Sequence, residues 1–153
     1  MDVVKEYIKY IKTKKKLSDN TVSSYFIDIK KYVEYLNNKN INLEKVGEND
    51  IIAYLMELER CNVSVSTISR MISSIKSFHD YLFFNGNCDN NPARNIKKPK
   101  VKVQNVDVLT EDEIDALLNF AKLDTPKQIR DKAIFEVLYG TGIKVSELVE
   151  MNM

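Results

Sequence analysis

The chain has 153 residues with 44% hydrophobic residues and a net charge of +1, enough apolar content for one domain, or for a small domain with part of another. No apolar run approaches the roughly 20 residues that span a bilayer, and residues 1–16 carry charges throughout, unlike a signal peptide. Cys61, Cys88 and the single histidine, His79, match no metal-ligand spacing. We therefore expect a cytoplasmic protein with free thiols, no metal site and no membrane segment.

Four helices are predicted in residues 1–86. Ser18 is a favourable N-cap for the second helix, Ser64 or Ser66 for the fourth, and the third is expected to follow Asn49. Gly86 ends the fourth helix. The apolar stripes, in chain order, are Val4, Tyr7, Ile8 and Ile11; Val22, Tyr25, Phe26, Ile29, Val33 and Leu36; Ile51, Ile52, Leu55 and Leu58; and Ile68, Ile72, Ile75, His79 and Leu82.

The remaining residues predict a linker followed by a second group of helices. Residues 87–108 have no helical period, and two prolines there favour extended backbone, which indicates a basic linker. TEDE (110–113) matches a capping box, and Thr125 with Pro126 begins a further helix that runs to a glycine turn at Gly140 and Gly142. We expect a mainly α chain with a helical domain at 1–86, a linker at 87–108 and further helices at 109–153.

Basic charge is concentrated in the fourth helix and the segment after it. Residues 66–104 hold seven cations and two acids, whereas residues from 105 onward hold five cations and ten acids. Hydroxyls and cations on a helix can contact phosphates and base edges, although a solvated face would also be polar. The polar face of the fourth helix, without an acid before Asp80, is predicted to contain Thr67, Arg70, Ser73, Ser74, Lys76 and Ser77.

Two further basic features have two interpretations each. The linker lysines could follow a phosphate backbone or form a soluble loop; they are Lys97, Lys98, Lys100 and Lys102. At the glycine turn, Lys144 precedes a short helix whose start could hold an anion, with Glu147 one turn on to support the lysine, or the turn is a plain corner. The run 12–16 is interpreted as solvated.

Five segments occur in one order along the chain. They are LSDNTVSSYFIDIKKYVEYL (17–36), STISRMISSIKSFHDYLFFNG (66–86), NNPARNIKKPK (90–100), VLTEDEIDALL (108–118) and YGTGIKVSELVEMN (139–152). Together they resemble the tyrosine recombinases of the phage-integrase family, especially its Xer-like bacterial members. In that resemblance they are the second helix, the major-groove-facing fourth helix, the interdomain linker, the start of the catalytic domain, and the box of the first catalytic arginine.

The resemblance implies a four-helix SAM-like core-binding bundle on one face of duplex DNA, a basic linker, and the first helices of an α/β catalytic domain. It implies an enzyme that cuts and rejoins DNA through a covalent 3′-phosphotyrosyl intermediate, without a metal, ATP or another small-molecule cofactor. The implied partners are double-stranded DNA and, for the full-length protein, a tetramer on two DNA sites that can include a second recombinase.

The chain departs from the family pattern at its catalytic residues. Lys144 stands at the position of the first arginine, and a lysine lacks the planar fork that binds two phosphate oxygens. The family's later residues, including the nucleophilic tyrosine, have no counterpart here, so we expect a fragment that binds DNA without cleaving it. A non-catalytic helical DNA-binding regulator and a protein-interaction bundle are the alternatives, but neither needs the linker and the glycine box together.

Overall fold

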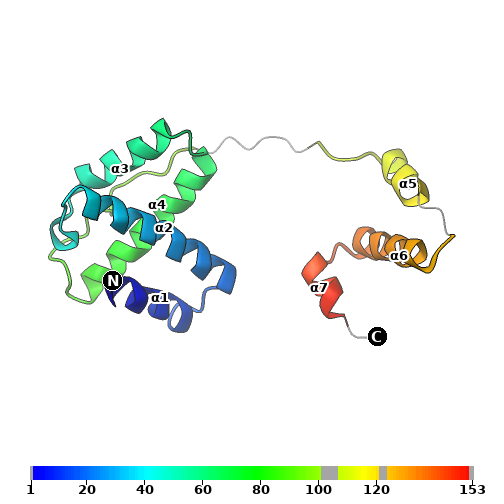
Figure 1. Ribbon diagram of the computed structural model, residues 1–153, viewed down its shortest axis with the longest axis horizontal. Helices are drawn as coiled ribbons and strands as arrows, with labels where there is room; N and C mark the ends of the chain where they lie inside the picture. The colour runs from blue at the N-terminus through cyan, green and yellow to red at the C-terminus, as the bar shows by residue number, and fades with distance from the viewer. Residues whose placement is uncertain (1, 101–106, 121–123, 152–153) are drawn as a thin grey trace. The chain divides into compact units, whose positions relative to one another are not determined.

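The computed structural model describes residues 2–100, 107–120 and 124–151 (Figure 1). The described residues form seven α-helices and one short 3-10 helix, with no strand among them, so the predicted mainly α fold is confirmed. Within the same ranges, none of the helices has both the length and the hydropathy to cross a membrane. The chain divides into two compact units, Met1–Val103 and Gln104–Met153.

The first unit is a bundle of four helices, α1 (Asp2–Thr13), α2 (Asp19–Asn38), α3 (Glu48–Arg60) and α4 (Val65–Phe84), with a 3-10 helix at Leu43–Lys45. Helices α2 and α4 share the most extensive contact, α1 packs on α2, and α3 packs on α4 (Figure 1). Aromatic rings of α1 also pack on α4, in the pairs Tyr7–Phe78 and Tyr10–Tyr81, so α4 contacts all three other helices of the bundle.

Local capping explains where these helices begin. The Ser18 hydroxyl accepts a hydrogen bond from the backbone N–H of Thr21 at 3.3 Å, and the Ser64 hydroxyl accepts one from Thr67 at 3.2 Å, as expected for N-caps. Helix α3 begins one residue before Asn49, at Glu48, because the Asp50 carboxylate accepts the backbone N–H of Gly47 at 2.9 Å and closes the turn.

One hydrophobic core fills the bundle. Every residue that the sequence placed on the inner side of the fourth helix is buried: Ile68, Ile72, Ile75, His79 and Leu82. Two stripe residues of other helices are exposed instead, Phe26 on α2 and Ile52 on α3. Phe26 lies at the edge of the α1–α2 contact, where it lines a shallow pocket with Val4 and Val33, because the apolar stripe of α2 is wider than the surface that its neighbours cover.

A buried polar pair crosses the core between α2 and α4. The Tyr32 hydroxyl lies 2.9 Å from Nε2 of His79, and both side chains are buried. No partner for Nδ1 of His79 is found within the described residues. Burial lowers the pKa of His79 to about 4, since the charged imidazolium loses its hydration. His79 is thus buried at the inward position that the helical period predicts, with one of its two ring nitrogens bonded.

The segment after α4 packs back onto the bundle, although we expected a linker from residue 87. Gly86 ends the helix as predicted, with a φ of +71°. Ala93 and Ile96 are buried in the core, and Asn91 bonds Asp80 at 2.7 Å and the backbone N–H of Ala93 at 2.9 Å. Residues 92–95 form a turn rather than extended backbone, because that turn carries both apolar side chains to the core. Residues 101–106 of the expected linker lie outside the described residues.

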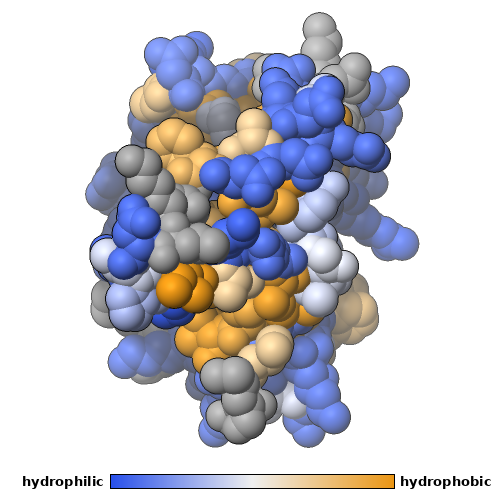
Figure 2. Space-filling view, turned by 90° about the vertical axis from the view of Figure 1, so that its right-hand side faces the viewer, coloured by the Kyte–Doolittle hydropathy of each residue, from blue (hydrophilic) through white to orange (hydrophobic). Residues whose placement is uncertain are grey.

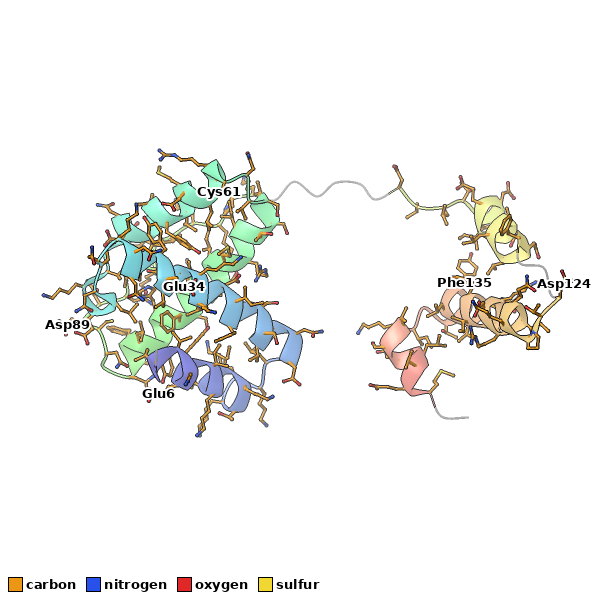
Figure 3. All side chains as sticks on the ribbon, in the orientation of Figure 1. Glu6, Glu34, Cys61, Asp89, Asp124 and Phe135 are labelled. Atoms are coloured by element: carbon orange, nitrogen blue, oxygen red, sulfur yellow. The ribbon has the colours of Figure 1, made fainter. Side chains whose placement is uncertain are left out.

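The second unit contains α5 (Glu111–Phe120), α6 (Pro126–Thr141) and α7 (Val145–Glu150), of which no residue is buried. The capping box at Thr110 is confirmed, as is the cap of α6 at Thr125. Figure 2 shows apolar side chains exposed among charged ones on the face that it views. The exposed apolar residues of these three helices include Leu117, Phe120, Ile129, Phe135, Tyr139, Val145 and Val149; Phe135 is labelled in Figure 3.

We predict that backbone amides of α5, α6 and α7 exchange with solvent faster than those of α4 in the 153-residue chain. Helices without a buried side chain open at low free-energy cost, whereas α4 opens only with the core of the bundle. Hydrogen exchange read residue by residue measures this difference. Equal protection in α4 and α6 would contradict it.

We also predict that the first unit loses stability as the pH falls from about 6.5 to about 4. The pKa of His79 is depressed in the folded state, so the unfolded chain binds the proton more tightly over that window. The loss is about 3 kcal/mol in the free energy of unfolding. Urea unfolding of the wild type and of His79→Gln at several pH values measures it. Parallel pH profiles for the two proteins would show that His79 is not responsible.

Candidate nucleic-acid interface

The outer face of α4 carries the polar side chains that the sequence singled out, with one exception. Ser74 is fully buried and bonds the carbonyl of Met71 at 2.9 Å and Asp28 at 3.2 Å, so its placement on the polar face is wrong. The α2–α4 contact covers that edge of the helix. We call the remaining outer surface, formed by Thr67, Ser69, Arg70, Ser73, Lys76 and Ser77, the α4 face.

Arg70 on the α4 face is paired with an acid that the sequence pattern does not reveal. Its Nη1 atom lies 2.5 Å from Oδ2 of Asp28 on α2 and donates to the carbonyl of Ser24 at 3.4 Å. Asp28 is 1% exposed, whereas the Arg70 side chain is 42% exposed. Burial raises the pKa of Asp28, and the Arg70 guanidinium and the Ser74 hydroxyl oppose that shift. An acid thus lies beneath the α4 face before Asp80, supplied by a neighbouring helix.

Lys15 joins the α4 face from the turn between α1 and α2. Its ammonium donates to the Ser77 hydroxyl at 3.1 Å and lies 5.8 Å from the centre of the Tyr10 ring. The sequence interpretation placed this lysine in a solvated run, because the residues alone do not show that the turn meets α4 sixty-two positions later. Lys16 has a φ of +51°, which bends the chain at this turn.

The other edge of the face is bounded by the segment after α4. The Lys76 ammonium donates to the backbone carbonyl of Arg94 at 3.1 Å, and the Arg94 side chain is exposed. Cations from two separate stretches of sequence, Lys15 and Arg70 with Lys76, therefore lie on or beside one helix face. Such an arrangement is suited to a polyanion.

The two remaining hydroxyls have local roles. The Thr67 hydroxyl accepts from the Ser64 hydroxyl at 2.8 Å within the N-cap of α4, and Ser73 donates to the carbonyl of Ser69 at 3.0 Å. Each oxygen keeps lone pairs, so these bonds leave room for further contacts. Three of the predicted linker lysines, Lys97, Lys98 and Lys100, are exposed, and Lys102 lies outside the described residues.

Lys144 and Glu147 form a small capping arrangement in the second unit. Gly142 has a φ of +66° and ends α6, as predicted. One oxygen of Glu147 accepts the backbone N–H of Lys144 at 2.8 Å, and the other lies 3.8 Å from its ammonium. The Lys144 side chain is 80% exposed. The Glu147 carboxylate therefore occupies the start of α7, which one of the two interpretations assigned to an anion, and it holds the Lys144 side chain only through a long, exposed ion pair.

Among the described residues, no group of three His, Cys, Asp or Glu side chains could hold a metal. Tyr7, Tyr32 and Tyr54 are buried in the core, and burial raises the pKa of each phenol above its ordinary value. A phenol in that setting stays protonated and packed, which makes these tyrosines structural rather than nucleophilic.

Comparison with known proteins identifies the family of the chain. Residues 4–86 match the family described as "Phage integrase, N-terminal SAM-like domain", and residues 107–153 match the "Phage integrase family". The chain is 38% identical over 152 residues to tyrosine recombinase XerD of Oceanobacillus iheyensis, which covers 98% of this chain and 51% of that protein. It is 37% identical over 139 residues to XerD of Shewanella oneidensis, covering 91% of this chain and 46% of the relative.

A third relative, tyrosine recombinase XerC of Roseiflexus castenholzii, is 33% identical over 152 residues, covering 98% of this chain and 48% of that protein. The chain thus spans about half the length of the relatives that it matches. Both of its units match the same family, in the order in which they occur along the chain. The chain belongs to the phage-integrase family of tyrosine recombinases and is similar to its Xer members.

Proposed function

We propose that this chain is the DNA-binding portion of a site-specific recombinase, and that the α4 face contacts duplex DNA. The observation that carries the proposal is the convergence of Lys15, Arg70 and Lys76 on one face of a helix rich in small hydroxyls. Cations bind phosphates, and small side chains let a helix approach base edges closely. The exposed lysines Lys97, Lys98 and Lys100 extend the same charge along the chain.

The full-length enzyme in this proposal cuts and rejoins DNA through a covalent 3′-phosphotyrosyl intermediate. It acts as a tetramer on two DNA sites that can include a second recombinase. Residues 1–153 supply DNA contacts and Lys144, at the position of the family's first catalytic arginine, but not the nucleophile. The 153-residue chain alone therefore binds DNA without cleaving it or forming a covalent adduct. The division into a DNA-binding domain, a linker and the start of a catalytic domain, and the role of Lys102, are part of the same proposal, with the first domain extended to include the packed segment through Ile96.

The chain is predicted to bind duplex DNA weakly and with strong salt dependence. Each phosphate contact that is lost should reduce the slope of log affinity against log salt by about 0.9, because fewer counterions are released. Fluorescence anisotropy at several salt concentrations measures the slope for the wild type, Lys15→Ala, and Arg70→Ala combined with Lys76→Ala.

Lys39→Ala is the matched control, since Lys39 lies at the C-terminal end of α2 and contacts Tyr35 rather than the α4 face. We expect its slope to equal that of the wild type. Affinity that does not change with salt, or equal slopes for all four proteins, would exclude this face as the DNA contact.

The second prediction concerns position 144 in the full-length recombinase. A guanidinium can hold two phosphate oxygens where an ammonium holds one, so Lys144→Arg should cleave DNA faster than the wild type. Lys144→Ala should be slower, within the roughly 10²–10³-fold that one transition-state donor supplies. Suicide-substrate cleavage measures the three rates, with Lys127→Arg on α6 as the control for a lysine exchanged elsewhere. Equal rates for all variants would place Lys144 outside the active site.

A further inference from the structure

Asp28 is a buried carboxylate on α2 whose two side-chain partners both come from α4. Its exposure is 1%, and Asp28, Ser74 and His79 are the buried polar or charged side chains of the described residues. A carboxylate in such a position is costly unless its oxygens are bonded. Among the described residues, Asp28 accepts two side-chain hydrogen bonds, both at Oδ2, from Arg70 at 2.5 Å and from Ser74 at 3.2 Å. Its burial thus depends on the α2–α4 contact and on Arg70.

The same contact uses only one corner of the Arg70 guanidinium. Nη1 donates to Asp28 and to the carbonyl of Ser24, both on α2. Within the described residues, Nη2 and Nε make no hydrogen bond to the protein, and the side chain is 42% exposed. A guanidinium carries its N–H donors in a rigid plane, so holding one corner also orients the rest.

We propose that Asp28 is a positioning residue for DNA binding, which fixes Nη1 of Arg70 so that the Nη2 and Nε edge points outward to take one phosphate of the duplex. Ser74 supports it by holding the same carboxylate oxygen. This inference rests on the proposed function of the α4 face. An arginine that is already fixed loses less rotamer freedom on binding than a free one, which favours the bound state.

The effect of Asp28→Asn on DNA affinity tests the proposal, because overall charge and the orientation of Arg70 predict changes of opposite sign. Removing a negative charge beneath a DNA-binding face strengthens binding if only the overall charge matters. Releasing Arg70 weakens binding if its orientation matters. We expect about tenfold weaker binding at fixed salt, the scale of one hydrogen bond to a charged group.

The experiment is a double-mutant cycle on the 153-residue chain, with a duplex oligonucleotide as the probe and anisotropy as the readout. Asp28→Asn should weaken binding in the wild type but not in the Arg70→Ala background, because Asp28 acts through Arg70. Ser74→Ala should weaken it in the same direction and by less. Glu34→Gln is the matched control, an acid of the same helix that is 58% exposed and labelled in Figure 3; its affinity should stay equal or rise.

A second variant serves where Asp28→Asn does not fold, as judged by circular dichroism. Arg70→Lys keeps the charge and can pair with Asp28, but its single nitrogen has no second edge for a phosphate. We expect it to bind DNA as weakly as Arg70→Ala. Wild-type affinity for Arg70→Lys, or unchanged or tighter binding by Asp28→Asn while Arg70→Ala is weak, overturns the inference and leaves the proposed function standing. A wild-type chain that does not bind the duplex overturns both.

Discussion

The contact between α2 and α4 is the constraint on which the rest of the first unit depends. It buries the apolar stripes of both helices and also brings two polar pairs together, Tyr32 with His79 and Asp28 with Arg70. Apolar packing tolerates small shifts between helices, whereas buried hydrogen bonds are lost when donor and acceptor separate. The pairs therefore set the register of α4 against α2, and with it the direction of the α4 face.

The register of α4 against α2 connects the stability of the bundle with the proposed DNA binding. Arg70 satisfies a buried acid on one side and is open to solvent on the other, so one side chain belongs to both the core and the surface. Lys15 and Lys76 repeat this pattern at the edges of the face, where each bonds a neighbouring part of the protein. The cations are held in place by the fold rather than left free on long side chains.

Local features of the fold were predictable from sequence, because they depend on neighbours in the chain. The caps at Ser18 and Thr125 and the end of α6 at Gly142 are of this kind. Helical periodicity also identified the inner side of α4, but it placed Ser74 outside and said nothing of Asp28, since the burial of both depends on which helix lies opposite. Lys15 was missed for the same reason. The family resemblance singled out Lys144 as a candidate residue. The hydrogen bond from its backbone N–H to Glu147 could be seen only in the structure.

The packed segment after α4 extends the part of the chain that the bundle needs to keep its core. Ala93 and Ile96 complete the core from beyond the glycine that ends the helix, and the carbonyl of Arg94 receives Lys76. Transplanting the bundle into another protein with a junction at Gly86 would leave a hole in the core and an unbonded lysine on the α4 face. A junction after Ile96 carries these contacts along, so the smallest portable piece includes the start of the segment that the sequence marks as a connection.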